Sequence, residues 1–198
     1  MRIVHYTLGL YPDRSGGLNR YSTDLIKAQS KEHDVVALLP GPWRPWRREC
    51  RIERRASKNG IKRFVMCNAL PIPLLYGIRM PSDFMTVHID KRNFEEFFVE
   101  MNPDVIHLHT LMGMPEEALC FFKDKGVKIV YTSHDYFGIC PKVNLINNKG
   151  ILCGGPKPER CALCNSNAPS TFFLRLRNSN LVFKVRDIIR WIKSMTFL

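Results

Sequence analysis

A histidine and an aspartate, His134 and Asp135, directly follow the apolar segment VKIVYTS. If that segment is a strand, the His134 imidazole lies at its carboxyl end, where it can donate a hydrogen bond to a bound hydroxyl or stabilise charge in a transition state. Upstream, His107 and His109 alternate with apolar residues in DVIHLH and therefore share one face of a strand. Only His109 stands at the end of its segment, so we expect His107 to be packed in the interior. We take His134 and Asp135 as candidate catalytic residues, with a purely structural role as the alternative.

A glycine pair, Gly16-Gly17, stands between the first apolar segment and the first helical pattern, and Ser15 precedes it. Glycines at such a place let the backbone approach a ligand, and helix N–H groups there can receive an anion. The complete G-x-G-x-x-G fingerprint is missing, so a structural turn is the alternative. Arg20, one turn into the expected helix, is placed either to reach a phosphate or carboxylate or to lie in solvent. The candidate substrate-binding residues are Ser15, Gly16, Gly17, Arg20 and His109.

Four cysteines are spaced C-x12-C-x7-C-x2-C, at Cys140, Cys153, Cys161 and Cys164. The Cys-x2-Cys pair is a chelating spacing, and the glycines and proline after Cys153 are typical of zinc knuckles. In a reducing compartment, a closed four-thiolate zinc site is favoured over two disulfides. Such a zinc is structural, because it leaves no open coordination position. Disulfides or redox use, and plain free thiols, are the alternatives.

Apolar segments of strand length alternate with amphipathic helical patterns through the first two thirds of the chain. This alternation is typical of a parallel sheet covered by helices on both faces. We therefore expect a Rossmann-like α/β domain over residues 1–139, with ligands beyond the carboxyl ends of the strands. The expected strands are residues 1–8, 34–40, 61–67, 104–109 and 127–133, and the expected helices include residues 17–30, 94–101 and 115–125.

The basic residues are unevenly distributed along the 198 residues, whose net charge is +12. Residues 41–63, which include the arginine-rich loop expected before the strand at 61–67, hold nine basic and two acidic residues, and residues 171–198 hold six and one. The rest of the chain is balanced, unlike a uniformly basic nucleic-acid-binding protein. Both segments mix apolar side chains with Lys and Arg, which suits RNA or an anionic membrane surface. We expect the membrane and not nucleic acid as partner; a solvated loop and a packed helix are the alternative.

The region after residue 139 differs from the alternating pattern. Residues 140–166 are expected to form a Cys-rich insertion, and residues 167–198 a basic amphipathic helical tail. No apolar run reaches the roughly 18 residues of a membrane span, because prolines interrupt the nearest run, residues 64–78. The N-terminus enters a strand-like run without a signal-peptide core. We therefore expect a cytoplasmic protein with peripheral contact to the inner face of the cell membrane.

Several stretches resemble the N-terminal domain of family 4 glycosyltransferases, from Met1 to about Cys164. The stretches are SGGLNRYSTDLIKAQSKEHDVVALLP, PDVIHLHT and KIVYTSHDYFGICPKVNLI, followed by GILCGGP and RCALC. The HDYFGICP stretch with the following cysteines is the most specific part. These enzymes have the GT-B fold, in which two Rossmann-like domains face each other across a cleft. This sequence is similar to the subset of these enzymes that builds bacterial capsular, O-antigen or exopolysaccharide chains.

The resemblance implies transfer of a sugar from a nucleotide-sugar donor to a glycan or lipid-linked acceptor. It also implies retention at the anomeric carbon without a divalent metal. By resemblance, Gly16 and Gly17 lie beside the donor phosphates or the acceptor, and His134 contacts the transferred sugar. Asp135 orients the histidine or its loop, and the cysteine cluster has no catalytic role.

The chain departs from the family pattern after Cys164. In the family, a C-terminal domain with a Glu-x7-Glu motif holds the donor nucleotide, and such a domain does not fit into the remaining residues. We therefore expect an acceptor-side half that is truncated and nearly inactive alone, or that meets a donor-binding half in trans. One alternative is a non-catalytic, zinc-stabilised module that contacts an anionic membrane or RNA. A redox protein that uses Cys161 and Cys164 is another.

Overall fold

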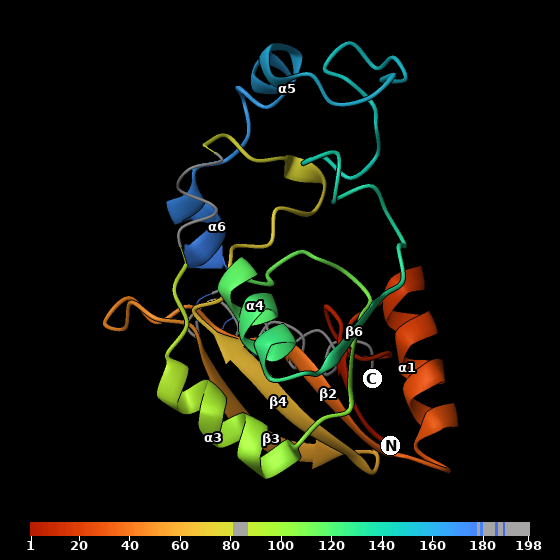
Figure 1. The fold of residues 1–198 in the computed structure, drawn as a ribbon. Helices are drawn as coiled ribbons and strands as arrows, with labels where there is room; N and C mark the ends of the chain where they lie inside the picture. Colours follow the sequence, from red (N-terminus) through yellow and green to blue (C-terminus); the bar gives the residue numbers. More distant parts are fainter. Residues whose placement is uncertain (81–86, 178, 180–184, 186–187, 189–198) are drawn as a thin grey trace.

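Alternating strands and amphipathic helices build one six-stranded sheet with helices on both faces (Figure 1). The structure is a computed structural model that describes residues 1–80, 87–177, 179, 185 and 188. The expected α/β fold is confirmed. The described strands are β1 (Arg2–Tyr6), β2 (Asp34–Pro40), β3 (Arg51–Lys58), β4 (Ile61–Cys67), β5 (Val105–Leu108) and β6 (Lys128–Tyr131). The described helices are α1 (Gly17–Gln29), α3 (Lys91–Met101), α4 (Glu116–Asp124), α5 (Pro158–Cys164) and α6 (Thr171–Arg177), with a 3-10 turn η1 (Leu74–Tyr76).

The sheet order is β3-β4-β2-β1-β5-β6, and all neighbouring strands are parallel except β3 and β4. The expectation of an arginine-rich loop before the strand at 61–67 is therefore wrong in part, because residues 51–58 form an antiparallel edge strand. Asn59 and Gly60 join β3 to β4 with φ of 51° and 77°, the two positive φ angles that a tight hairpin turn requires. The charged composition of RIERRASK hid the strand, since an edge strand tolerates many exposed charges.

Successive residues of β1 point to opposite faces of the sheet, and each face has its own apolar core. Val4 and Tyr6 belong to the larger core, which includes the buried phenylalanines of α3 and α4. Ile3 belongs to a smaller core with Ile26 of α1. His5, next to Ile3 in the alternation, cannot face the same side as Val4 and Tyr6 but shares the α1 face. This parity puts an imidazole inside the sheet–helix interface.

Local sequence determines where the helices begin and end. The Asp90 carboxylate accepts a hydrogen bond from the backbone N–H of Asn93 at 3.0 Å and caps α3. That helix ends at Asn102, whose φ is 39°. Gly126, with φ of 78°, follows α4 as the expected stop. These signals fix where α3 and α4 begin and end. Together with α1, these helices cover both faces of the sheet (Figure 1).

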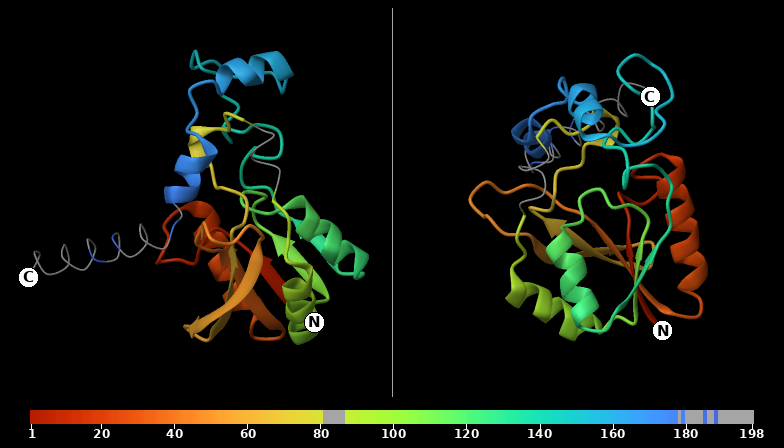
Figure 2. Two further views of the ribbon diagram at one scale, coloured as in Figure 1. Left: turned by 90° about the vertical axis from the view of Figure 1, so that its left-hand side faces the viewer. Right: turned by 45° about the horizontal axis from the view of Figure 1, so that its top comes forward.

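After β6 the chain leaves the sheet, passes through the Cys-rich segment and α5, and then forms α6 (Figures 1 and 2). A parallel bridge between Trp43 and Ser179 ties the end of this path to the loop after β2. Most of the predicted basic helical tail lies outside the described residues. None of the described helices combines the length and apolarity needed to cross a membrane.

Candidate functional site

Two strand ends bring histidines to the carboxyl edge of the sheet. His109 directly follows β5, and His134 lies three residues after β6. Their ring centroids are 5.8 Å apart, and Tyr21 of α1 packs edge-on at 5.9 Å from His109 and 4.8 Å from His134. His109 is fully buried, whereas His134 is exposed. The structure thus brings together the two histidines that the sequence placed at strand ends, and it adds Tyr21.

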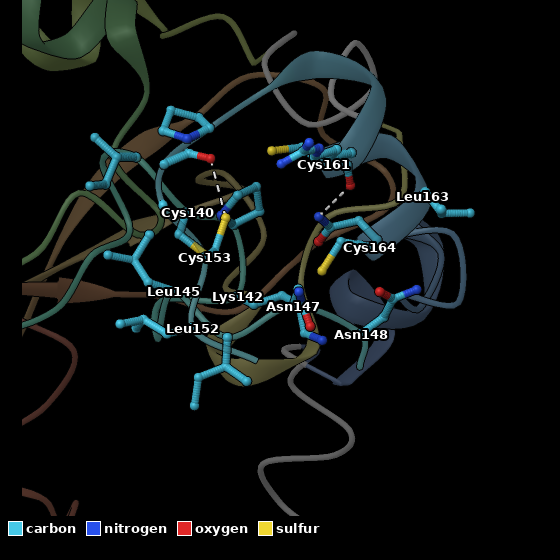
Figure 3. Close-up of a pocket in the computed structure, with 18 of the residues that line it drawn as sticks. Cys140, Lys142, Leu145, Asn147, Asn148, Leu152, Cys153, Cys161, Leu163 and Cys164 are labelled. Carbon is cyan, nitrogen blue, oxygen red and sulfur yellow. Dashed lines mark hydrogen bonds between the residues drawn. The ribbon is translucent and has the colours of Figure 1, made fainter. Parts of the chain in front are cut away.

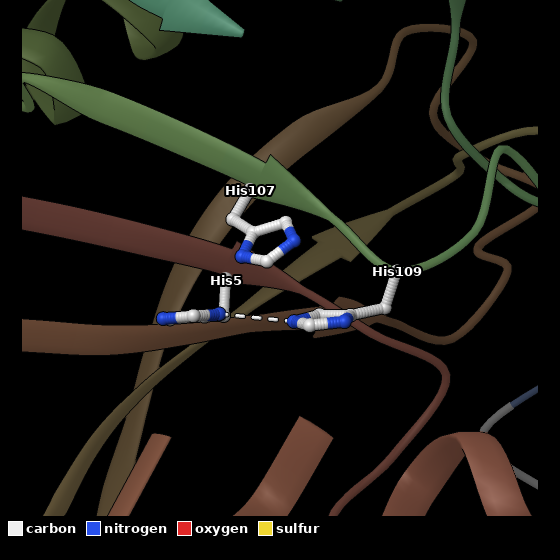
Figure 4. A group of neighbouring side chains, drawn as sticks. All are labelled: His5, His107 and His109. Atoms are coloured by element: carbon white, nitrogen blue, oxygen red, sulfur yellow. Dashed lines mark hydrogen bonds between the residues drawn. The ribbon is translucent and has the colours of Figure 1, made fainter. Parts of the chain in front are cut away.

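Two more histidines stand behind this pair, so that His5, His107 and His109 form a cluster (Figure 4). His5 and His107 are register partners in β1 and β5, with ring centroids 5.2 Å apart, and His107 lies 4.3 Å from His109. His107 is half-buried, and its Nε2 lies 2.8 Å from Thr132 Oγ1. Sequence analysis missed His5, because the adjacency of β1 and β5 is not visible along the chain. Its only signal is a polar residue in an apolar strand.

Hydrogen bonds define where the protons of this cluster sit. Gln29 Oε1 lies 2.8 Å from His5 Nε2, which therefore donates. The neutral His5 ring then accepts at Nδ1, which lies 3.0 Å from His109 Nε2. Neutral His109 is left with a bare lone pair on Nδ1, and this buried atom finds no hydrogen-bond partner among the described residues. The chain from Gln29 to His109 thus ends in a hydrogen-bond acceptor.

Burial keeps these imidazoles neutral. Desolvation, with a smaller contribution from His107, lowers the pKa of His5 to about 4 despite the hydrogen bond that His5 donates to Gln29. Desolvation and the neighbouring histidines lower the pKa of His109 to about 3. Desolvation and His134 also lower the pKa of His107. At neutral pH the buried cluster therefore carries hydrogen bonds without adding positive charge to the edge of the sheet.

A groove of about 1070 Å³ runs along the loop that follows β1. Ser15 lines this groove, as do residues of the strand ends of β2 and β4. Lys58, Arg63 and Arg177 give it a basic wall, and the Lys58 ammonium contacts Asp13 at 2.5 Å. An anionic substrate group fits this charge. Arg177 was beyond the reach of sequence reasoning, because it comes from α6, far along the chain.

The glycine pair and Arg20 lie at the start of α1. Gly16 has φ of 123°, a backbone conformation that favours glycine, and its carbonyl accepts from the Arg20 backbone N–H. A Cβ on Gly17 would meet no atom of the described chain within 4 Å, so the space beside this backbone is open. The Arg20 guanidinium lies 5.0 Å from the Tyr11 ring centroid and 3.7 Å from Asp24. Arg20 is therefore held by Tyr11 and Asp24, and no contact links it to the histidines.

Asp135 organises the turn after β6. Its Oδ1 accepts from the Phe137 backbone N–H at 2.9 Å, and its carbonyl accepts from the Ser133 hydroxyl at 2.8 Å. These bonds are typical of an Asx turn. Of the two roles implied for Asp135, the geometry matches orientation of the loop that carries His134.

The four clustered cysteines line one pocket of about 320 Å³ but do not converge on a metal position (Figure 3). Cys161 and Cys164 stand on α5, whereas turn hydrogen bonds hold the backbones of Cys140 and Cys153 on another part of the wall. All four are free thiols, and Cys153 Sγ donates to the Gly155 carbonyl at 3.2 Å. Among the described residues, the four Sγ atoms do not form a group that lies within 4.8 Å of one another. The structure therefore does not support the four-thiolate zinc site, which stays a prediction.

Among the described residues, one group of three or more His, Cys, Asp or Glu side chains has all its possible metal-ligand atoms within 4.8 Å of one another. This group consists of His5, His107 and His109. Four of their six ring nitrogens take part in hydrogen bonds, between His5 Nδ1 and His109 Nε2, between His5 Nε2 and Gln29, and between His107 Nε2 and Thr132. We therefore describe the cluster as a hydrogen-bond network.

Comparison with known proteins adds the family. Residues 15–152 match the profile of Glycosyltransferase Family 4. The catalytic domain of starch synthase IV from Arabidopsis thaliana, solved bound to ADP and acarbose, is similar at 18% sequence identity and a TM-score of 0.38. That match covers 90% of this chain and 43% of the synthase chain, so this chain spans less than half of its length. No curated protein sequence matches. Because the family profile covers more than half of the chain, this protein belongs to Glycosyltransferase Family 4.

Proposed function

We propose that the chain is the acceptor-side half of a retaining glycosyltransferase that moves a sugar from a nucleotide-sugar to a glycan or lipid-linked acceptor. The observation that carries the proposal is the meeting of His109, His134 and Tyr21 at the carboxyl edge of the sheet in a chain of this family. Sequence resemblance supports capsule, O-antigen or exopolysaccharide synthesis at the cytoplasmic membrane face. A donor-binding half, in the same chain or in trans, completes the cleft.

In this proposal residues 1–139 are the acceptor-side domain, residues 140–166 an insertion and residues 167–198 a basic tail. The groove along the loop after β1 receives the anionic part of a substrate on Lys58, Arg63 and Arg177. The exposed His134 donates a hydrogen bond to the transferred sugar, and Tyr21 holds its ring from the side. His109 stays neutral behind it, so substrate contacts at this point depend on the orientation of His134.

Changing His134 to alanine is expected to lower turnover on the order of 100-fold, because it removes a hydrogen bond aimed at the reacting sugar. The free energy of unfolding should change by less than about 0.5 kcal/mol, since the side chain is exposed. Turnover is measured with the chain joined to or mixed with a donor-binding domain, a panel of nucleotide-sugars and a lipid-linked acceptor.

His88→Ala is the matched control, because its 83% exposed side chain hydrogen-bonds to Glu117 on the α4 side of the molecule. It should leave turnover unchanged, and His134→Gln should retain part of it through its amide donor. Equal turnover for His134→Ala and His88→Ala would remove His134 from the site. Full sugar transfer by this chain without any donor-binding half would contradict its role as an acceptor-side half.

A further inference from the structure

The nine basic residues between positions 41 and 63 fall into two groups in the structure. Most contact acidic side chains, and Arg63 donates to the Ala56 carbonyl. Arg47 and Arg48 are exposed and form no ion pair within the described part of the chain. The acid-paired cations are Arg44 and Arg55 with Glu53, Arg51 with Asp90, Arg54 with Glu100, Lys58 with Asp13 and Lys62 with Asp34. Apart from Arg63, the basic residues of this segment without an acidic partner among those described are therefore Arg47 and Arg48 of its WRR sequence.

A buried asparagine fixes the loop that carries Arg47 and Arg48. Asn68, with φ of 55°, accepts from the Arg44 backbone N–H at 2.6 Å. Its amide also donates to the carbonyls of Arg44 at 3.2 Å and Arg47 at 2.8 Å. Because the loop backbone is held at three points, Trp46 remains 73% exposed instead of folding onto the core. The loop thus presents one indole and two guanidinium groups to solvent.

Helix α6 brings the second basic segment to the same place. The Phe172 ring packs edge-on against Trp43, with centroids 5.9 Å apart. Arg175 of this helix is likewise without an acidic partner among the described residues. The two segments enclose a concavity of about 450 Å³, and none of its lining residues is acidic. We call this surface the loop–α6 patch, consisting of Trp43, Trp46, Arg47, Arg48, Phe172 and Arg175.

The patch combines two chemistries. Its three guanidinium groups match phosphate oxygens, and its exposed rings, Trp46 at 73% and Phe172 at 63%, suit the headgroup region of a bilayer. Phe173 and Leu176 extend the apolar part along α6, at 53% and 42% exposure. Single-stranded RNA favours a long basic track with stacked bases, whereas this patch is short and part of its apolar surface comes from a helix.

We propose that the loop–α6 patch binds the phosphate headgroups of an anionic phospholipid membrane. The proposal rests on the proposed function for its purpose, which is to hold the chain where a lipid-linked acceptor is found. Arginines then pair with lipid phosphates, while Trp46 and Phe172 enter the interface. Tertiary structure creates this site from two segments that are far apart in the sequence.

The test is co-sedimentation of the full chain with vesicles of phosphatidylglycerol and phosphatidylcholine, compared with phosphatidylcholine alone. The triple variant Arg47→Gln, Arg48→Gln and Arg175→Gln should reduce partitioning to the anionic vesicles on the order of 100-fold, since each basic residue contributes about fivefold near such a surface. The matched control changes three exposed lysines on other faces, Lys27, Lys31 and Lys123, to glutamine. It removes the same charge and should reduce partitioning by less than about threefold. Unchanged thermal unfolding checks that both triples are folded.

Equal losses for the two triple variants would overturn the proposal, because net charge and not the patch would then govern binding. It would also be overturned if the chain bound an RNA oligonucleotide or soluble pyrophosphate through these arginines but not the anionic vesicles. The assay contains no sugar donor. A failed His134 prediction therefore leaves the membrane result intact, and failed vesicle binding leaves the proposed sugar transfer to be judged by turnover.

Discussion

Replacing Gly113 with alanine is expected to lower the free energy of unfolding by about 4 kcal/mol. Gly113 has φ of 85°, where an L residue costs about 1 kcal/mol, and its new Cβ would stand 2.5 Å from Tyr6 Oη. Tyr6 is completely buried and its hydroxyl donates to the Met112 carbonyl at 2.7 Å, so the ring cannot move aside freely. Overpacking costs about 1–3 kcal/mol, and a damaged buried hydrogen bond about 1 kcal/mol more. Urea unfolding measures the change.

Gly126→Ala is the matched control, because Gly126 has a similar φ of 78° but no atom lies within 4 Å of its added Cβ. It should cost only the backbone part, about 1 kcal/mol. Combining Gly113→Ala with Tyr6→Phe removes the colliding oxygen, so the double variant should be more stable than the sum of the two single changes predicts. Similar costs at positions 113 and 126 would show that the collision with Tyr6 is relieved without strain. The turn at Gly113 matters for the candidate site because it ends the loop segment that begins at His109.

Acid should destabilise the protein well before its carboxylates titrate. His5 and His109 have folded pKa values of about 4 and about 3, against 6.5 in the unfolded chain. Between about pH 6.5 and 4 the unfolded chain therefore binds protons that the folded chain excludes, so the free energy of unfolding decreases as pH falls. Stability from this source is complete above about pH 6.5. The expected loss by about pH 4.5 is roughly 3 to 5 kcal/mol for the two rings together.

Proton uptake on unfolding checks this prediction, from the slope of the free energy of unfolding against pH. His109→Gln should reduce the uptake between about pH 6 and 5 from about two protons toward one. Its amide N–H can still donate to His5 Nδ1. His88→Gln, at an 83% exposed side chain, should leave the slope unchanged in that range. A flat stability profile from pH 6.5 to 4.5 would mean that the cluster is open to water and titrates normally.

Local sequence predicts most of this fold, because the relevant interactions lie within a few residues. Apolar runs and glycine stops predict β1, α1, β2, β4, β5, α4 and β6 close to their observed bounds. The predicted places of His109 and His134 follow as well, since a residue after a parallel strand lies at the carboxyl edge wherever that strand sits in the sheet. The family resemblance also rests on local sequence motifs, and it agrees with the match to the family profile over residues 15–152.

Local sequence does not predict which strand lies at the edge of the sheet or which residues pair over long distances. β3 looks like a charged loop because its outer residues are exposed and its acidic partners, Asp90 and Glu100, come from the N-terminal cap and the body of α3. The zinc site predicted at Cys140 and its three neighbours has no support from the structure for the same reason, since thiol spacing in sequence says little about loops held by their own backbone hydrogen bonds.

The residues alone predict the alternating α/β fold, the strand-end histidines and the two basic segments. The contact between His5 and His109 cannot be predicted in this way, because the pairing and register of β1 and β5 set it. Tertiary structure also pairs most of the basic side chains between positions 44 and 62 with carboxylates. It places Arg175 beside Arg47 and Arg48. Charge and proton affinity depend on neighbours in space, and burial and distance are properties of the folded chain.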